Sequence, residues 1–515
     1  MSQGGPAILS LLIVVPVVGA LIAPFLDRRR PGLIKGWALV ISLLAAGLAV
    51  LMAADFRSGF ADMQWEEHLS WLPALGISYH VGVDGVSVLL VALTAFLTPV
   101  AILAAWKEME GRAKEYTVFL LLLEAGMIGA FVALDLALFF VFWEAMLIPL
   151  VLLIGVCGGE RRVYAALKFF IYTAVGSLAM LLAIVGLAIQ YKGQTGQYSF
   201  DLQQLAGMQV PPDVAFWMFI AFAVAFAIKV PVFPLHAWLP DAYTQAPTAI
   251  LVLATMMVKV GTYGLLRFGL TLFPQQMVAA APVFLTLGVI GVVYAGLVAI
   301  VQRDVVRLVA FSSVGHMAFI VLGIFSLNQQ GISGATLQML NHSISTGGLF
   351  ILAAMVNERT RSTRIADLGG LAERWPVMAA LFTLVLFSSV GLPGLNGFVG
   401  EFLILLGTFQ AEPVAAVIAG SGVVLAAVYL VWMFQRTMHG ADSGRGAGTR
   451  DLSGREVLTL IPIVAMVVWI GLFPTTLLGK MEASVGTLVI QAQKAAQVQT
   501  DGRAAAALSQ FQVDR

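Results

Sequence analysis

The sequence has very little charge for its length. Of its 515 residues, 11% are Asp, Glu, Lys or Arg, 60% are hydrophobic, and the net charge is +1. Soluble domains carry roughly 25% charged residues, so a soluble enzyme, a nucleic-acid-binding protein and a disordered scaffold are excluded. Since about 20 apolar residues cross one bilayer as a helix, the composition predicts an all-α membrane protein with about fourteen transmembrane helices.

The sequence also lacks the residues that hold common cofactors. Cys157 is its one cysteine, which excludes a disulfide framework, a cysteine-ligated zinc site and an iron–sulfur cluster. It has no glycine-rich dinucleotide motif, no Walker phosphate loop and no Gly-x-Ser-x-Gly nucleophile motif. We therefore expect no cofactor site and no metal site on this chain, and any redox chemistry would belong to a partner subunit.

Long apolar blocks dominate the rest of the chain. They are too long for the strands of a membrane barrel, which have about 10 residues and alternate polar with apolar, so we interpret them as helices. The fourteen blocks lie near residues 7–26, 34–54, 86–106, 116–134, 136–157, 165–190, 214–235, 247–270, 281–301, 307–327, 335–356, 377–409, 414–436 and 457–478. The tail after residue 480 is rich in Ala, Gln and Val and is expected to form a surface helix.

The basic residues indicate the orientation in the membrane. Alternate loops divide them unequally, with 20 of the 29 Lys and Arg on one side and 7, including Arg267, on the other. Because cytoplasmic loops carry the excess of Lys and Arg, both termini are predicted to lie outside the cytoplasm. The first six residues carry no basic side chain, so we expect the first block to be a retained helix rather than a cleaved signal. Two lysines remain, Lys229 and Lys259, and both fall inside apolar blocks.

Other ionisable residues also fall at membrane depth. A charge at the bilayer centre costs several kcal/mol, so such residues face a bundle interior or a water-filled cavity. Structural ion pairs and interhelical hydrogen bonds would explain one such residue equally well, but a series along successive helices favours an ion pathway. Beside the two lysines, the series contains Glu124, Glu144, Glu401, His316 and His342.

Two of the apolar blocks are interrupted by closely spaced helix-breaking residues next to an ionisable residue. Pro231 and Pro234 follow Lys229 closely, and the Gly-Leu-Pro-Gly segment 391–394 precedes Glu401. Interrupted helices in corresponding positions of two halves are typical of inverted-repeat transporters. The pattern predicts helices one to three in residues 1–115, a first repeat (helices four to eight) in 116–270 and an inverted repeat (nine to thirteen) in 281–436. A loop, the last helix and the tail follow in 437–515.

A buried lysine is well suited to proton transfer. Burial disfavours its charged form and a nearby carboxylate favours it, so the approach of a carboxylate controls its proton. Glu144 is the expected partner of Lys229. His316 and His342 are suitable relays, and metal ligation by these histidines is a weaker alternative because no local ligand spacing supports it. The roles of Glu124 and of His236, at the end of the seventh block, stay open.

The motifs around these residues resemble the antiporter-like membrane subunits of respiratory complex I, the NADH:quinone oxidoreductase. The resemblance covers nearly the whole chain, and Glu401 favours the branch of the family that has glutamate rather than lysine at this position. It rests on the segments 82–86, 142–144, 168–173, 229–248, 313–317, 338–342 and 393–402.

The resemblance implies a role for each buried residue. Glu144 and Lys229 resemble the charged pair of helices five and seven, and Lys259 resembles the central lysine of helix eight. His316 and His342 resemble the relays that follow, and Glu401 the terminal glutamate from which a proton leaves. The family fold has fourteen helices with two inverted five-helix repeats.

The resemblance also implies the partners and the location. FMN, iron–sulfur clusters and quinone are expected in partner subunits, with none of them on this chain. The other membrane-arm subunits, the NADH-oxidising arm and the lipid bilayer are the expected partners, without nucleic acid, in a bacterial inner membrane.

Two departures from the family pattern keep a related alternative open. Tyr243 stands where the family usually has histidine, and residues 249–252 are Ala-Ile-Leu-Val in place of a Gly-Ser-Val-type stretch. At both positions the sequence resembles Mrp-type Na⁺/H⁺ antiporter subunits, so a subunit of such an antiporter is the alternative. A third alternative, a structural membrane anchor for a redox complex, does not require two buried lysines and three buried glutamates.

Overall fold

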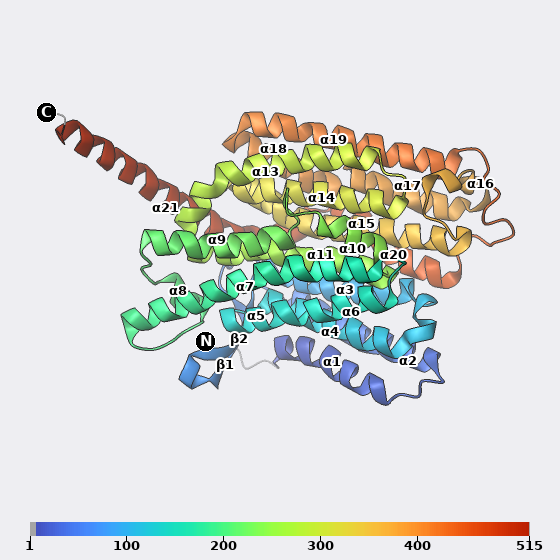
Figure 1. Ribbon diagram of the computed structural model, residues 1–515, viewed down its shortest axis with the longest axis horizontal. Helices are drawn as coiled ribbons and strands as arrows, with labels where there is room; N and C mark the ends of the chain where they lie inside the picture. Colours follow the sequence, from blue (N-terminus) through green and yellow to red (C-terminus); the bar gives the residue numbers. More distant parts are fainter. Residues whose placement is uncertain (1–6, 514–515) are drawn as a thin grey trace.

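The computed structural model describes residues 7–513 of the chain, with side chains described for residues 7–501. Its helices run side by side along the long axis of the molecule, as Figure 1 shows. Within the described residues, thirteen helices are long and apolar enough to cross a membrane. The remaining expected block, the twelfth at 377–409, forms two shorter helices, so the prediction of about fourteen spans in an all-α membrane protein is confirmed.

The elements up to residue 272 include the one β-hairpin of the described chain. They are α1 (Ile8–Ile22), η1 (Ala23–Phe25), α2 (Pro31–Asp55), β1 (Gln64–Leu72), η2 (Pro73–Leu75), β2 (Ile77–Val83), α3 (Ser87–Ala104), η3 (Glu108–Arg112), α4 (Ala113–Val132), α5 (Leu136–Ala145), α6 (Leu147–Cys157), α7 (Arg162–Thr195), α8 (Leu202–Ala206), α9 (Pro212–Lys229), α10 (Trp238–Gln245), α11 (Thr248–Gly264), the π-helical turn η4 (Leu265–Gly269) and α12 (Leu270–Leu272).

The remaining elements are helical. They are α13 (Pro274–Ile300), α14 (Val305–Phe325), α15 (Gln329–Thr360), η5 (Ile365–Asp367), α16 (Leu371–Arg374), α17 (Pro376–Val390), α18 (Asn396–Ala411), α19 (Pro413–Phe434), the π-helical turn η6 (Gln435–His439), α20 (Gly454–Leu472) and α21 (Thr475–Val513).

Both predicted helix breaks are present. α9 ends at Lys229, and the chain resumes as a helix only at Trp238, because Pro231 and Pro234 cannot donate the backbone hydrogen bonds that would continue it. α17 ends at Val390, and Gly391 adopts a left-handed conformation with φ of 83° that suits a glycine helix end. Each break leaves an ionisable residue beside irregular backbone.

Three helices form the centre of the bundle. All of the most apolar window of α11 is buried, and 94% of the corresponding windows of α14 and α15 is buried. The outer helices α2, α19 and α20 bury only 33% of theirs, and exposed Leu, Val and Phe side chains face outward, as expected for a lipid-facing surface. Side chains on the three central helices are therefore enclosed by protein.

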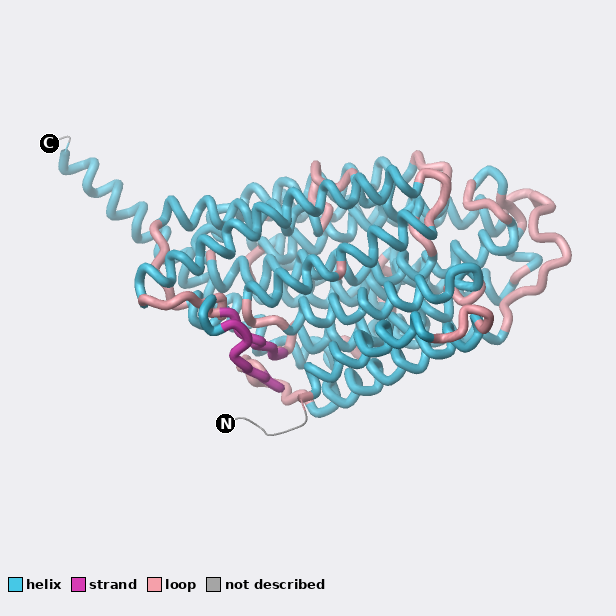
Figure 2. Tube along the Cα trace, turned by 60° about the horizontal axis from the view of Figure 1, so that its bottom comes forward, coloured by secondary structure: helices cyan, strands magenta, loops and turns pink. Residues whose placement is uncertain are grey.

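One end of the bundle carries the β-hairpin. β1 and β2 pair antiparallel, with His68 opposite His80, and the tip turns through Gly76. Figure 2 shows the two strands at the same end as the projecting part of α21. The expected C-terminal helix is present and extends over residues 475–513, and its first part is packed against α13 and α15, with Met481 and Val485 buried.

Candidate functional site

Lys259 is the most enclosed charged side chain of the candidate site. It lies on the central helix α11, and none of its surface is exposed. Its Nζ is 2.5 Å from Nδ1 of His342 on α15 and 3.2 Å from the sulfur of Met317. On the other side of the ring, Nε2 of His342 lies 2.9 Å from the Ser313 hydroxyl. An amine and an imidazole at hydrogen-bond distance are able to exchange a proton directly.

A second contact pair continues this line of side chains. The His316 ring lies 5.7 Å from the His342 ring, centroid to centroid, and its Nδ1 is 2.9 Å from Oε1 of Glu401. That distance suits an ion pair, but the ring is not aligned for a hydrogen bond. Gln338 on α15 donates to the same glutamate oxygen over 3.1 Å. Lys259, His342, His316 and Glu401 therefore form a continuous buried series across α11, α15, α14 and α18.

The break between α17 and α18 positions Glu401. Asn396, the first residue of α18, accepts from Ser345 through its side chain and from Asn341 through its backbone carbonyl, which fastens the start of α18 to α15. The backbone of Gly391 approaches the carboxylate so closely that a Cβ there would lie 2.9 Å from Oε2 of Glu401. Only a residue without a side chain leaves the carboxylate in this place.

A small pocket lies beside the glutamate end of the series. Its lining includes His316, Glu401 and Tyr429, with glycine and apolar residues of α13, α14 and α19. The hydroxyl of Tyr429 donates to Ser312 over 2.9 Å. This pocket places polar groups and space next to Glu401, which is where a proton leaving the series would need an acceptor.

Lys229 and Glu144 do not make a salt bridge in this structure. The Lys229 ammonium lies over the Trp143 ring, 4.8 Å from its centroid, and Trp143 itself donates to Ser177. One carboxylate oxygen of Glu144 is buried without a hydrogen-bond partner. Lys229 is buried, whereas Glu144, which was expected to be buried, is only half-buried, and the two residues do not pair in this structure.

The two lysines lie on helices that pack closely. A Cβ on Gly261 of α11 would lie 3.0 Å from the Cβ of Lys229 on α9, and Gly261 is two residues from Lys259. The absence of a side chain at Gly261 allows this approach. Lys229 and Lys259 are therefore on neighbouring turns of adjacent helices, although within the described chain they make no hydrogen bond to each other.

Three further residues that the sequence singled out lie outside this series. His236 lies in the turn between α9 and α10 and forms a cluster of three rings with Phe233 and Tyr294, whose centroids are 5.6 and 5.0 Å from its own. Tyr243 is buried on α10 and its hydroxyl has no hydrogen-bond partner. Glu124 on α4 is fully buried, and neither carboxylate oxygen has a partner in the described structure.

Arg267 corrects one assignment made from the sequence. We counted it among the basic residues of an external loop, but it is buried in the π-helical turn η4. It pairs with the buried Asp84 over 2.6 Å and donates to the Tyr263 hydroxyl over 3.1 Å. Because its acidic partner is 183 residues away in sequence, only the fold brings this ion pair together.

Sequence reasoning also missed an acidic residue that links two cations. Asp241 on α10 bonds to Lys168 of α7 over 2.7 Å and to Arg307 of α14 over 3.0 Å. It lies just after the break in α9, and all three side chains are partly exposed. This group connects α7, α10 and α14.

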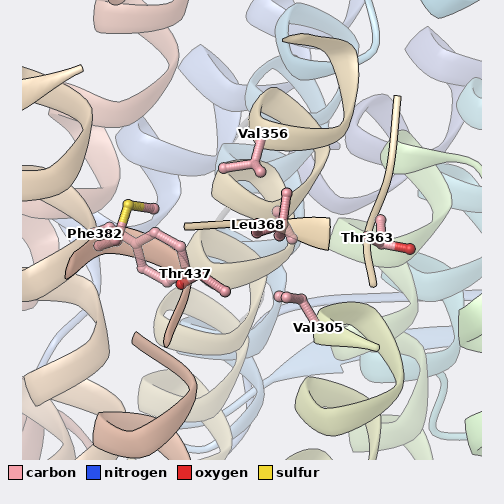
Figure 3. Close-up of a pocket in the computed structure, with 8 residues that line it drawn as sticks. Val305, Val356, Thr363, Leu368, Phe382 and Thr437 are labelled. Carbon is pink, nitrogen blue, oxygen red and sulfur yellow. The ribbon is translucent and has the colours of Figure 1, made fainter. Parts of the chain in front are cut away.

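A separate pocket near the same end is almost entirely apolar. Figure 3 shows its lining, which includes Val305, Leu368 and Phe382, with the hydroxyls of Thr363 and Thr437 as its polar atoms. It contains none of the ionisable residues of the buried series. An ion pathway would need charged or water-binding groups, so this pocket is not part of the candidate site.

Comparison with known proteins agrees with the geometry. Residues 133–427 match the family described as NADH:quinone oxidoreductase/Mrp antiporter, TM. The chain is 40% identical to NADH-quinone oxidoreductase subunit M of Rhodobacter capsulatus, covering 94% of this chain and 96% of that protein. It is 39% identical to NADH-ubiquinone oxidoreductase chain 4 of Arabidopsis thaliana, covering 93% and 97%.

Solved structures have the same fold. A chain of respiratory complex I from Thermus thermophilus with bound NADH superposes with a TM-score of 0.84 at 33% identity, covering 93% of this chain and 99% of that one. A chain of the Mrp complex from Dietzia superposes with a TM-score of 0.80 at 21% identity, covering 94% and 99%, which shows a shared fold. The protein therefore belongs to the NADH:quinone oxidoreductase/Mrp antiporter family of membrane subunits.

Proposed function

We propose that this chain is a proton-translocating membrane subunit of an NADH:quinone oxidoreductase. The buried series from Lys259 through His342 and His316 to Glu401 carries this proposal, because it offers proton donors and acceptors in sequence across four helices. The relatives with 40% and 39% identity are both subunits of such an enzyme by name. The chain contributes to an oxidoreductase as a translocating part, and it contains none of the cofactor motifs that electron transfer requires.

The proton path runs along the buried residues. A proton enters near the broken helix, loads Lys229 and then Lys259, passes His342 and His316, and leaves at Glu401. Glu144 controls the first step, because its approach to Lys229 stabilises the ammonium and its withdrawal releases the proton. Residues 116–270 and 281–436 act as the two repeats that hold the two halves of this path.

Energy for the movement arrives from other subunits. FMN, iron–sulfur clusters and quinone are held by those subunits, and the membrane-arm neighbours transmit the effect of their redox chemistry. The chain lies in a bacterial inner membrane with both termini on the non-cytoplasmic side, since the loops rich in Lys and Arg are cytoplasmic.

The test measures pumping in the assembled complex. Lys259→Met and Glu401→Gln each keep side-chain volume and remove a titratable group, and Lys494→Met on the exposed part of α21 is the matched control. We expect the two buried variants to assemble normally and to lose most NADH-driven proton uptake into inverted vesicles, while the control pumps like the wild type.

The outcome separates three functions. Normal pumping per assembled complex in both buried variants would refute the proton path. Loss of assembly without loss of pumping per complex would indicate a structural anchor. Purification of the tagged chain with only small hydrophobic partners, without NADH:quinone activity, would instead indicate an antiporter subunit.

A further inference from the structure

A cluster of metal-binding side chains lies on the β-hairpin, away from the proton path. His68 on β1 and His80 on β2 are directly opposite in the strand register, with ring centroids 4.6 Å apart. Asp201, just before α8, reaches the same place. One ligand atom from each of these three residues lies within 4.8 Å of the other two.

The two nitrogens of His80 face different carboxylates. Nδ1 of His80 is 2.5 Å from the Asp201 carboxylate, and its Nε2 is 2.6 Å from Oε1 of Glu66 on β1. His80 and Asp201 are buried, with exposed fractions of 4% and 6%, whereas His68 and Glu66 are exposed. The cluster of His68, His80 and Asp201 thus has two buried donors and one movable donor at the surface, and Glu66 lies on the other side of the His80 ring from Asp201.

We propose that His68, His80 and Asp201 bind a divalent transition metal ion, of which Zn²⁺ is the best match, with water as the fourth ligand. Two imidazoles and one carboxylate are a usual zinc donor set, and the imidazoles disfavour Ca²⁺ and Mg²⁺, which prefer oxygen donors throughout. The proposal is independent of the proton path, because none of these residues belongs to the buried series.

The geometry requires a small rearrangement. Tetrahedral ligands about 2.0–2.1 Å from zinc lie about 3.4 Å from one another, whereas the three atoms now lie within 4.8 Å. The exposed His68 side chain is free to rotate towards the ion, and His80 and Asp201, now 2.5 Å apart, would separate by about 0.9 Å to admit it. Zinc would replace the hydrogen bond between His80 and Asp201.

Metal binding would fasten two segments that are distant in sequence. β1 and β2 belong to the hairpin ahead of α3, and Asp201 caps α8 in the connection from α7 to α9. A metal ion shared by the two segments would cross-link the hairpin to that connection and restrict its opening. We therefore expect zinc to slow amide hydrogen exchange in residues 64–83.

The experiment uses the assembled, detergent-solubilised complex after treatment with a chelator. Zn²⁺ is titrated in competition with a fluorescent chelator into the wild type, into His68→Ala, which removes the exposed donor, and into Glu66→Gln, which changes the group on the other side of the His80 ring. The matched controls are His439→Ala and Glu482→Gln, which remove an exposed histidine and an exposed glutamate elsewhere. Since other subunits bind metal too, the readout is the difference in stoichiometry and affinity between variants.

We expect the wild type and both controls to bind one more Zn²⁺ per complex than His68→Ala, or to bind it at least tenfold more tightly. Co²⁺ added to the wild type should give the visible absorption of a four-coordinate nitrogen and oxygen site, and His68→Ala should lose it. Glu66→Gln should bind Zn²⁺ like the wild type, and a loss as large as that of His68→Ala would contradict the proposed donor set. Equal zinc binding and equal hydrogen exchange in wild type and His68→Ala would overturn the proposal.

Discussion

Replacement of Gly391 by alanine tests how closely the helix break determines the position of Glu401. A Cβ at residue 391 would lie 2.9 Å from Oε2 of Glu401, closer than real Cβ contacts allow, so the carboxylate must move by about half an ångström. The carboxylate is the far end of a flexible side chain, so this movement costs little stability. The movement does, however, change the 2.9 Å distance between Oε1 of Glu401 and Nδ1 of His316.

Backbone strain adds a second effect that must be separated from the first. Gly391 has φ of 83°, and a non-glycine residue in the left-handed region costs about 1–2 kcal/mol. Gly394, three residues later, has φ of 90° but nothing within 4 Å of its Cβ position. Gly394→Ala therefore introduces similar strain without contact to Glu401, and it is the matched control.

The assay compares NADH-driven proton uptake per assembled complex in the two variants. Both should assemble, because strain of this size is a small part of the free energy of unfolding. A misplacement of about 1 Å costs up to about 10²-fold in rate, so we expect Gly391→Ala to pump several-fold to tenfold more slowly than Gly394→Ala. Equal pumping in the two variants would refute the role of this contact.

Three further substitutions test individual contacts. Asp84→Ala should lower the free energy of unfolding by about 3–5 kcal/mol in a detergent denaturation assay, because it leaves buried Arg267 unpaired. Adding Arg267→Met to this variant should recover stability. If Asp84→Ala lowered the free energy of unfolding by less than about 1 kcal/mol, the ion pair would not have the expected weight. Asp241→Asn, whose two ion pairs are partly exposed, should cost less than half as much in the same assay; an equal loss would show that exposure does not weaken these pairs. Tyr429→Phe removes the hydroxyl that donates to Ser312 beside the glutamate pocket; we expect slower proton uptake with normal assembly, and unchanged uptake would exclude this hydroxyl from the exit.

The sequence predicted those features that depend on local chemistry. The length of each apolar block is enough to predict a membrane-spanning helix, so the thirteen long spans and the divided span at 377–409 were predictable. The prolines after Lys229 remove backbone donors, which gives the break at the predicted residue. Each Lys and Arg was assigned to a loop where possible, and Lys229 and Lys259 were left because they lie inside apolar blocks. The sequence therefore identified these two lysines as buried.

Features that depend on pairing between distant segments were not predicted. Arg267 was assigned to a loop because it is close to the end of its block, and the sequence does not show that Asp84 lies opposite it. The β-hairpin was also missed, although alternation of apolar and polar residues in 77–83 and the Gly76 turn were available signals. His68 and His80 meet only through the strand register.

The two halves of the buried site differ in how their charges are partnered, and this difference has a physical consequence. In the second half, Glu401 has both His316 and Gln338 within contact distance. In the first half, Lys229 has the face of Trp143, and a cation–π contact supplies about 2 kcal/mol, whereas an ammonium removed from water costs several kcal/mol. A carboxylate at 4 Å would add about 4 kcal/mol in surroundings of intermediate polarity. We therefore expect the approach of Glu144 to favour the ammonium form of Lys229 and its withdrawal to favour release of the proton. Glu401, in contrast, already has two contacts that hold its position.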